Sequence, residues 1–392
     1  MAKPRDKATM TAPQAQEGPV QPDMANTSSI EAIAQNERDM LDMHMLIQEQ
    51  QSMMPKVIDE KSCSKFTEIL NKYKSGKQNL EKKIIANEEF WKLRQWRYSN
   101  EANPKDFNPA TAWLWSCIQS RYSDTMDSYP TCNFLPRMKD DVEEAKKLSK
   151  IVPVVLAQNK YEETYSDIAW YTLKQGGSVQ GVFWDSSAHN GLGDIKIKKI
   201  DLLNFFWQPG ITDIQDSSYV FVTELVDNER LEQMYPQTHG HLSSGKTATI
   251  SHYLYDDQVN TEEKSVVVDV YYKKIVSGKK TLQYVKYVND QVLFATENEP
   301  QYVERGLYDH GKYPYVFDTL YPIEGSPCGY GFVDLCRNPQ TAIDLMNTAF
   351  VKNAMAGATP RVFKRADGGV NEEEFLDLTK AIVNVNGNLG ED

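Results

Sequence analysis

The spacing of apolar residues changes near residue 178 of this 392-residue chain, from a helical period to alternation. In residues 59–96, 110–127 and 140–174, apolar side chains recur every three or four positions, with polar residues between them. That period places the apolar side chains on one face of a helix. The pattern predicts three long helices. We expect the third to break at Pro153, because proline lacks a backbone N–H and clashes with the preceding turn.

Short alternating runs follow the helical half. The predicted strands are residues 178–185, 194–200, 219–226, 266–275, 281–289 and 291–295, with one short helix at 228–234. The first two strands flank Asn190-Gly-Leu-Gly193, a turn sequence of the kind that closes a hairpin. The last three form a meander with Ser277-Gly278 and Asn289-Asp290 at its turns. Helices followed by antiparallel strands indicate an α+β fold.

The most regular amphipathic pattern lies at residues 339–355. Asn338 suits the N-cap, Pro339 suits the first helical turn, and Gly357 is placed to end the helix. The predicted packing face consists of Ala342, Ile343, Met346, Ala349 and Phe350. The opposite face carries Gln340, Asp344, Asn347, Thr348 and Lys352. Such a helix usually packs on its own domain, but Gly-rich turns on both sides, including residues 325–331, would let it project as a separate rod.

Composition narrows the class of protein. The formal net charge of -12 does not favour tight binding to duplex DNA, because phosphate contacts need clustered Lys and Arg. No apolar run approaches the roughly 18 to 20 residues of a membrane helix. The five cysteines are scattered, which fits free thiols in a reducing compartment and argues against a zinc site. Residues 1–56, rich in Gln, Met, Ala and Pro, are expected to form a disordered arm.

One local motif has the form of a phosphate-binding loop, from Gly240 to Lys246 and Thr247. In such a loop backbone amides hold phosphates, the Lys meets their charge and the Thr binds magnesium. The loop should follow a buried strand and open a helix, but polar residues precede it and poor helix formers follow it. We therefore expect a surface loop. A nucleotide hydrolase that uses Lys246 and Thr247 stays open as the alternative function.

Two further groups of titratable residues have structural explanations. His239, His241 and His252 have no Cys or carboxylate at ligand spacing, so no metal site is expected. The carboxylates between Asp140 and Glu144 stand where negative charge favours the start of a helix. The sequence contains no nucleophile elbow, zinc-protease helix or dinucleotide fingerprint. We therefore expect neither an enzyme nor a cofactor.

From about residue 86 to residue 387, the order of short motifs resembles that of tailed-phage portal proteins. The motifs are Tyr129-Pro130, Leu135-Pro-Arg, Gly181-Val-Phe-Trp-Asp185, the turn at Gly191 and Gly193, Asn204-Phe-Phe-Trp-Gln-Pro209, His310-Gly-Lys-Tyr-Pro314 and Gly329 to Phe332. The chain departs from the family at Gln208, where such proteins often have Asp before the Pro.

The resemblance implies a non-enzymatic ring, typically of twelve subunits, at one capsid vertex, through which double-stranded DNA is packaged and ejected. Residues 57–332 would form an α+β wing of long helices and antiparallel strands. Residues 333–357 would be one projecting stem helix and 358–392 the start of a clip. The rest of the stem, wing and crown would lie beyond Asp392, so the resemblance predicts a C-terminally truncated chain.

The resemblance also implies partners and location. The partners would be further copies of the chain, the large terminase subunit, head-completion (adaptor) proteins, major capsid and scaffolding proteins, and DNA bound without sequence specificity. The protein would reside at the capsid vertex of the virion after assembly in the cytoplasm of a bacterial host, with no membrane contact. Near stem and clip, the basic residues that could face the channel are Lys352, Arg361, Lys364 and Arg365; solvated clip residues are the alternative.

Overall fold

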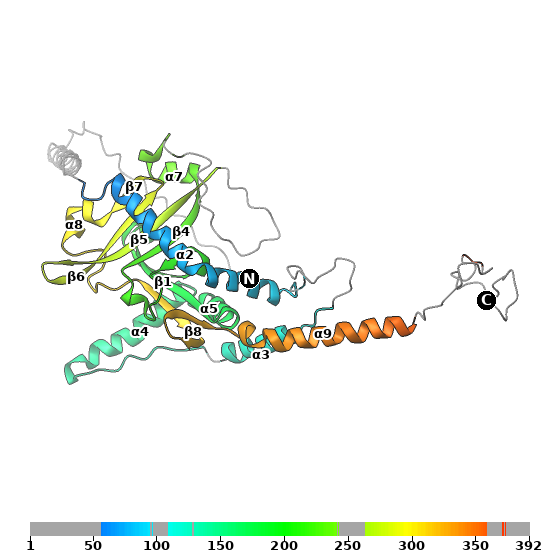
Figure 1. Ribbon diagram of the computed structural model, residues 1–392. Coiled ribbons are helices and arrows are strands. Elements are labelled where there is room, and N and C mark those ends of the chain that lie inside the picture. The colour runs from blue at the N-terminus through cyan, green and yellow to red at the C-terminus, as the bar shows by residue number, and fades with distance from the viewer. Residues whose placement is uncertain are drawn as a thin grey trace, which may run out of the picture. The chain divides into compact units, whose positions relative to one another are not determined.

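The computed structural model describes residues 56–94, 96, 109–127, 129–240, 242, 263–358, 371 and 373 (Figure 1). The elements described below all belong to the unit that begins at Ile58. The predicted arm at 1–56 and the predicted clip region at 358–392 lie almost wholly outside the described residues. The described part combines helices with antiparallel sheets, which confirms the α+β class.

The long helices lie where the sequence is periodic, but the third predicted segment forms two helices. The long helices are α2 (Glu60–Trp91), α3 (Trp113–Asp127), α4 (Val142–Gln158), α5 (Tyr161–Gln175) and α9 (Phe332–Ala358), and the short ones are α6 (Ala188–Gly191), α7 (Asn228–Met234) and α8 (Pro300–Val303). The predicted break at Pro153 is wrong, because Pro153 lies inside α4. It is exposed there, so water can reach the carbonyl that loses its donor. The helix instead ends at Gln158 with Asn159 as its C-cap, and Lys160 turns the chain with a left-handed φ of 50°.

Three antiparallel sheets make up the β part. Their strand orders are β2-β1-β8, β10-β9 and β3-β4-β5-β6-β7. The strands are β1 (Gly177–Asp185), β2 (Asp194–Ile200), β3 (Phe205–Trp207), β4 (Tyr219–Asp227), β5 (Lys264–Val276), β6 (Lys279–Val288), β7 (Gln291–Ala295), β8 (Tyr315–Thr319), β9 (Tyr321–Ile323) and β10 (Ser326–Tyr330). The predicted hairpin β1–β2 and the meander β5–β6–β7 are confirmed. The predicted Gly-rich turn at 325–331 is wrong over most of its length, because β10 occupies residues 326–330.

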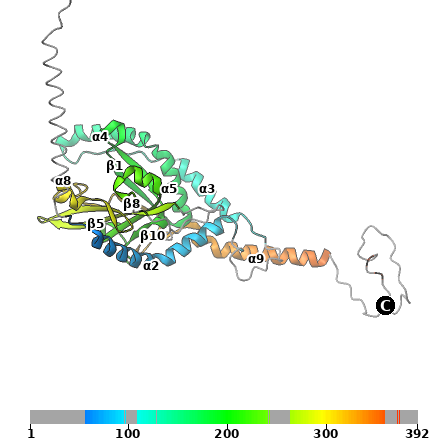
Figure 2. The ribbon, with the colours of Figure 1, turned by 90° about the horizontal axis from the view of Figure 1, so that it is seen from above.

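The five-stranded sheet has an apolar layer on each face. On one face α2 packs against it, and this layer contains Cys63, Phe66, Leu70, Phe221, Val270, Val285 and Tyr287. The other face meets the β2-β1-β8 sheet through Val179, Phe205, Tyr271 and Tyr315. In the view from above, α2 and α4 lie on opposite sides of these sheets (Figure 2). Alternate residues of β5 therefore enter different layers, as the period of a strand requires.

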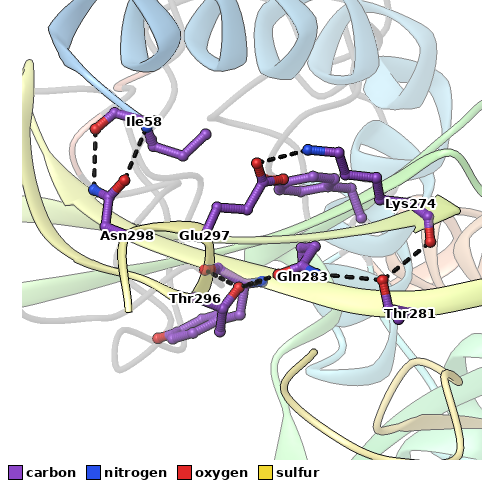
Figure 3. Close-up of polar contacts among 9 residues, drawn as sticks. Ile58, Lys274, Thr281, Gln283, Thr296, Glu297 and Asn298 are labelled. Carbon is purple, nitrogen blue, oxygen red and sulfur yellow. Dashed lines mark hydrogen bonds and ion pairs between the residues drawn. The ribbon is translucent and has the colours of Figure 1, made fainter. Parts of the chain in front are cut away.

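Polar side chains tie the beginning of α2 to the far end of the meander. The Asn298 amide donates to Ile58 O at 3.1 Å and accepts from Ile58 N at 2.9 Å (Figure 3). Beside it, the Lys274 ammonium pairs with the nearly buried Glu297 at 2.8 Å. Thr296 Oγ1 donates to Gln283 Oε1 at 2.6 Å. These contacts hold α2 in register on the sheet.

A buried lysine fixes the middle of α2. Lys77 is only 6% exposed, and its Nζ donates to the main-chain carbonyls of Leu202 at 2.5 Å, Leu203 at 3.2 Å and Phe205 at 2.6 Å. The same ammonium lies 4.4 Å from the centre of the Phe206 ring. Because no other donor reaches these carbonyls from α2, Lys77 positions the chain that enters β3.

We expect Lys77→Met to alter the pH dependence of stability. Burial lowers the pKa of Lys77 from 10.5 to about 8, so between these values the unfolded state binds more protons than the folded state. Wild-type stability should therefore rise with pH across this window, by at most about 1.4 kcal/mol per pH unit. The variant should lack this contribution to the rise. Urea unfolding of both proteins across the window measures the difference, and parallel profiles would contradict the prediction.

The outer edge of β2 is covered by a side chain. Asn159 Nδ2 donates to Ile195 O at 2.9 Å, and Asn159 Oδ1 accepts from Ile197 N at 3.0 Å. An amide placed in this way makes the same two hydrogen bonds that a neighbouring strand would make. An edge strand with free backbone groups is a template for unwanted pairing, so Asn159 blocks that pairing at the centre of β2.

Candidate assembly surface of the C-terminal helix

The first turn of α9 is built on a close approach of two backbones. The helix begins at Phe332, so Asn338 is not its N-cap, Pro339 lies inside it and Gly357 does not end it. At its start, Gly331 N donates to the Asp334 side chain at 3.0 Å, which caps the helix from its third position. A Cβ on Gly331 would stand 2.2 Å from Lys174 O, so only glycine fits beside the end of α5.

Apolar and polar contacts then hold the first two turns of α9. Val333 is fully buried in a cluster with Phe90, Leu114, Ile118 and Leu173, which come from α2, α3 and α5. This burial explains why the helix begins seven residues before Pro339. Lys83 pairs with Asp334 at 3.0 Å, and Arg337 donates to Asn87 Oδ1 at 2.5 Å, so α2 holds α9 through ionic and polar contacts as well.

A buried ion pair lies next to this cluster. Lys174 Nζ, at the end of α5, contacts Glu88 Oε1 at 2.7 Å and Oε2 at 2.9 Å. Burial lowers the pKa of Lys174, and the charge of Glu88 opposes that shift. Removing one partner of such a pair leaves an uncompensated buried charge, at a cost of about 3 to 5 kcal/mol. The pair therefore holds α5 against α2 next to the start of α9.

The middle of α9 buries its polar face. Gln340, Asp344 and Thr348 are 3%, 0% and 8% exposed. Asp344 Oδ1 accepts from Thr111 N at 2.9 Å and from Thr111 Oγ1 at 2.7 Å. Gln340 Oε1 accepts from Leu114 N at 3.0 Å, and its Nε2 donates to Thr111 O at 3.0 Å. Since the first N–H groups of a helix have no partner within it, these two side chains cap the N-terminus of α3 from another helix.

The apolar face of α9 is consequently turned outward. The large exposed side chains along it are Leu335, Leu345, Met346 and Phe350, with Phe350 at 75% and Met346 at 66% exposure. Ala342 and Ala349 are exposed and Ile343 is half-buried. None of the residues from Ala349 to Ala358 is buried. In both ribbon views these last turns extend past α3 (Figures 1 and 2).

The sequence-predicted residues are placed as follows. Ala342, Ile343, Met346, Ala349 and Phe350 form one stripe, but within the chain that stripe is mostly exposed, while Gln340, Asp344 and Thr348 of the opposite stripe are buried. Lys352 is exposed near the end of α9. Arg361, Lys364 and Arg365 lie outside the described residues, so their place in a channel stays a prediction.

The buried polar stripe was not foreseen, although the sequence carries a signal for it. Residues 340, 344 and 348 are four apart and hold short or amide side chains, where a solvated stripe usually carries Lys and Glu. Hydrogen-bonding residues at this spacing indicate a polar contact with another element. The position of that element, α3, could not be inferred locally.

The candidate phosphate loop lacks its expected context. Pro236–Thr238, immediately before it, is a 3-10 helix, where a nucleotide loop would follow a strand. Lys246 and Thr247, like His241 and His252, lie outside the described residues. Asp269, whose carboxylate could bind magnesium if it stood at the end of a strand, lies within β5 and accepts a hydrogen bond from Tyr284 Oη at 2.8 Å. These contacts do not build a nucleotide site in the described part of the chain.

Comparison with known proteins adds one positive finding. Residues 122–363, more than half of the chain, match the family model described as phage P22-like portal protein. The match runs from within α3 through all of α9. No curated protein matches the sequence. Among the helices that the structure describes, none has the length and apolarity to cross a membrane.

Proposed function

Because this chain belongs to the phage P22-like portal protein family, whose members are structural, non-enzymatic phage components, we propose that it is one subunit of a ring through which double-stranded DNA enters and leaves a phage head. The observation that carries the proposal is the outward-facing apolar stripe of α9. A stripe of exposed large apolar side chains on an otherwise acidic protein marks a surface that another molecule covers. In a ring, that molecule is the neighbouring subunit.

The polar anchors of α9 support this assignment. Asp344 and Gln340 fix the rotation of the helix about its axis, so that Met346 and Phe350 point away from the chain's own core. A helix that packed only on its own domain would bury its apolar stripe. In α9 the apolar stripe is exposed and can bind a second copy, whereas the polar stripe contacts α3 of the same chain.

We assign the parts of the subunit accordingly. Residues 57–332 form the wing, 333–357 the projecting stem helix and 358–392 part of the clip. The ring stands at one capsid vertex and is a dodecamer in its complete form. The clip binds the large terminase subunit and later the head-completion proteins, and the wing contacts the major capsid and scaffolding proteins. Some of Lys352, Arg361, Lys364 and Arg365 face the DNA channel.

The test is a change of the exposed stripe that spares the fold. Met346→Glu with Phe350→Glu places two charges on the surface that we assign to the subunit contact. Truncating one aromatic anchor of an interface costs about 2 kcal/mol or more, roughly a 30-fold weaker association. We expect rings in electron micrographs of the full-length wild-type protein and none of the full-length variant, with unchanged urea unfolding of the dissociated chain.

A matched control is Lys61→Glu with Lys65→Glu on the exposed face of α2. It changes charge without touching α9 and should leave ring formation intact. Rings that form equally well with the α9 variant, or a wild type that never associates, would overturn the proposed function.

A further inference from the structure

The five-stranded sheet carries opposite charges at its two ends. Strand β5 begins at Lys264 beside α7 and ends at Val276, where it turns into β6. The residues around its beginning are mainly acidic, and those around its end are mainly basic. This basic end stands out against the net charge of -12 that the whole chain carries.

The basic end is the tip of the β5–β6 hairpin together with a neighbouring loop. Its lysines are Lys273, Lys274, Lys279, Lys280 and Lys312. Two of them are engaged within the chain, since Lys273 donates to Gln215 and Lys274 pairs with Glu297 at 2.8 Å. Lys279, Lys280 and Lys312 are exposed, and no ion pair reaches them from the described residues.

The lysines at this tip lie close enough to affect each other. Burial lowers the pKa of Lys273, the charges of Lys280 and Lys312 lower it further, and the charges of Asp216 and Asp213 oppose the shift. Ile275, at the tip between these lysines, is 67% exposed. The hairpin therefore presents exposed lysines that form no ion pair with the described residues, placed around an exposed apolar side chain, and this combination is typical of a surface that binds protein.

The acidic end lies around α7. A hollow of about 750 Å³ there is lined by Asp227, Asn228, Glu229, Arg230, Glu232, Gln233 and Glu263. Lys264 pairs with Asp227 at 3.2 Å and His239 contacts Glu232 at 3.0 Å. Glu229 and Glu263 are exposed, and no ion pair reaches them from the described residues. The backbone of this end is fixed, because Asn228 N donates to Glu263 O at 2.9 Å.

The two ends cannot neutralise each other within one subunit. The 13 residues of β5 span about 40 Å at the usual rise of a strand. That distance is several times the Debye length of about 8 Å at physiological ionic strength. Each end can therefore gain from its opposite charge only on another molecule.

A second copy of this chain offers that opposite charge. Subunits of a ring meet head to tail, so each contact joins two different surfaces of the same sequence. We propose that the lysine-rich hairpin tip of one subunit binds the acidic hollow beside α7 of the next subunit. The inference rests on the proposed ring and names one of its contacts, separate from α9. Nucleic acid is the other polyanion that lysines attract, but the acidic body of the chain repels phosphates at long range.

The experiment is a charge exchange between the two ends. The first variant carries Lys279→Glu and Lys280→Glu, the second carries Glu229→Lys and Glu263→Lys, and the third carries all four changes. Like charges placed opposite each other weaken an interface strongly, so we expect the first two variants to raise the apparent dissociation constant about 10-fold or more. The third variant restores complementarity with reversed signs and should associate nearly as tightly as the wild type. An equimolar mixture of the first two should also associate.

Sedimentation velocity at several salt concentrations measures these constants. Lys65→Glu with Lys72→Glu on the exposed face of α2 changes the net charge as the first variant does, and should associate like the wild type. The measurements use the full-length protein, and if its wild type stays monomeric, the proposed ring fails and this contact fails with it. If the wild type associates and the first two variants do too, or if the third is not restored, only this contact is overturned. The first variant could also lose binding to a short DNA duplex while its subunits still associate. That result would identify the hairpin tip as a nucleic-acid surface and would likewise overturn the proposal.

Discussion

Replacing Asp344 by alanine is expected to lower the free energy of unfolding by about 3 to 5 kcal/mol. The side chain is fully buried and accepts hydrogen bonds from Thr111 N, Thr111 Oγ1 and Gln340 Nε2 at 2.7 to 3.0 Å. The change leaves both Thr111 donors without this acceptor, while Gln340 Nε2 keeps its hydrogen bond to Thr111 O. It also removes the negative charge that favours the N-terminal end of α3. Urea unfolding gives the size of the effect.

Hydrogen exchange locates the same effect in the structure. Exchange should accelerate at Thr111, Leu114 and the middle of α9, and little at β5 and β6. Asp344→Asn, which keeps one acceptor oxygen, should lose about half as much stability or less. The control is Asn353→Ala on the exposed part of α9, expected to change stability by less than about 0.5 kcal/mol. An Asp344→Ala protein as stable as this control would show that the buried polar stripe does not hold α9.

Replacing Gly331 by alanine is expected to destabilise the protein by about 4 kcal/mol or more, or to prevent folding. The new Cβ would stand 2.2 Å from Lys174 O and 2.7 Å from Gly176 N, both backbone atoms. Neither backbone can move freely, because Gly176 N donates to Thr172 O at 2.9 Å and Gly176 O accepts from Gly329 N at 3.2 Å. The yield of folded protein and its urea midpoint measure the loss.

Gly357→Ala is the matched substitution in the same helix. Nothing lies within 4 Å of a Cβ added there, and the position is exposed within α9. Because alanine favours a helix interior over glycine by about 1 kcal/mol, this variant should be equally or slightly more stable. If the two glycine variants had the same free energy of unfolding, the close approach of the backbones at Gly331 would not contribute to stability.

Sequence patterns were sufficient where a segment pairs with its neighbour along the chain. Strands β5, β6 and β7 are joined by short turns, and their alternation alone predicts the meander. The hairpin β1–β2 follows the same logic. By contrast, β8 pairs with the distant β1, and the three-residue β3 is too short to show a period, so neither was predicted.

Glycine misled the interpretation of residues 325–331. Turn chemistry is the usual reason for several glycines in a short segment, but Gly329 serves another purpose in β10. A Cβ there would meet Tyr321 O at 2.0 Å, so the residue permits close packing of β9 and β10. Pro339 misled in a similar way, because burial of Val333 extends α9 upstream of it. At residues 325–331 and at the start of α9, a tertiary contact determines the structure, and local sequence propensity does not predict such a contact.

The candidate surface was only half predictable. Amphipathic spacing separates the two stripes of α9, but it does not tell whether the partner that covers a stripe belongs to the same chain. The polar stripe of Gln340, Asp344 and Thr348 packs against the N-terminal end of α3 in the same chain, and Met346 and Phe350 on the other stripe stay exposed.

The amide of Asn159 on the edge of β2 has a consequence for how copies of this chain can come together. With that edge occupied, copies cannot lengthen the β2-β1-β8 sheet from this side by zippering their main chains. Contacts on this side then depend on side-chain surfaces, which separate and re-form readily when they are mismatched. In the ring that we propose, an incorrectly added copy can therefore leave this side before the ring closes.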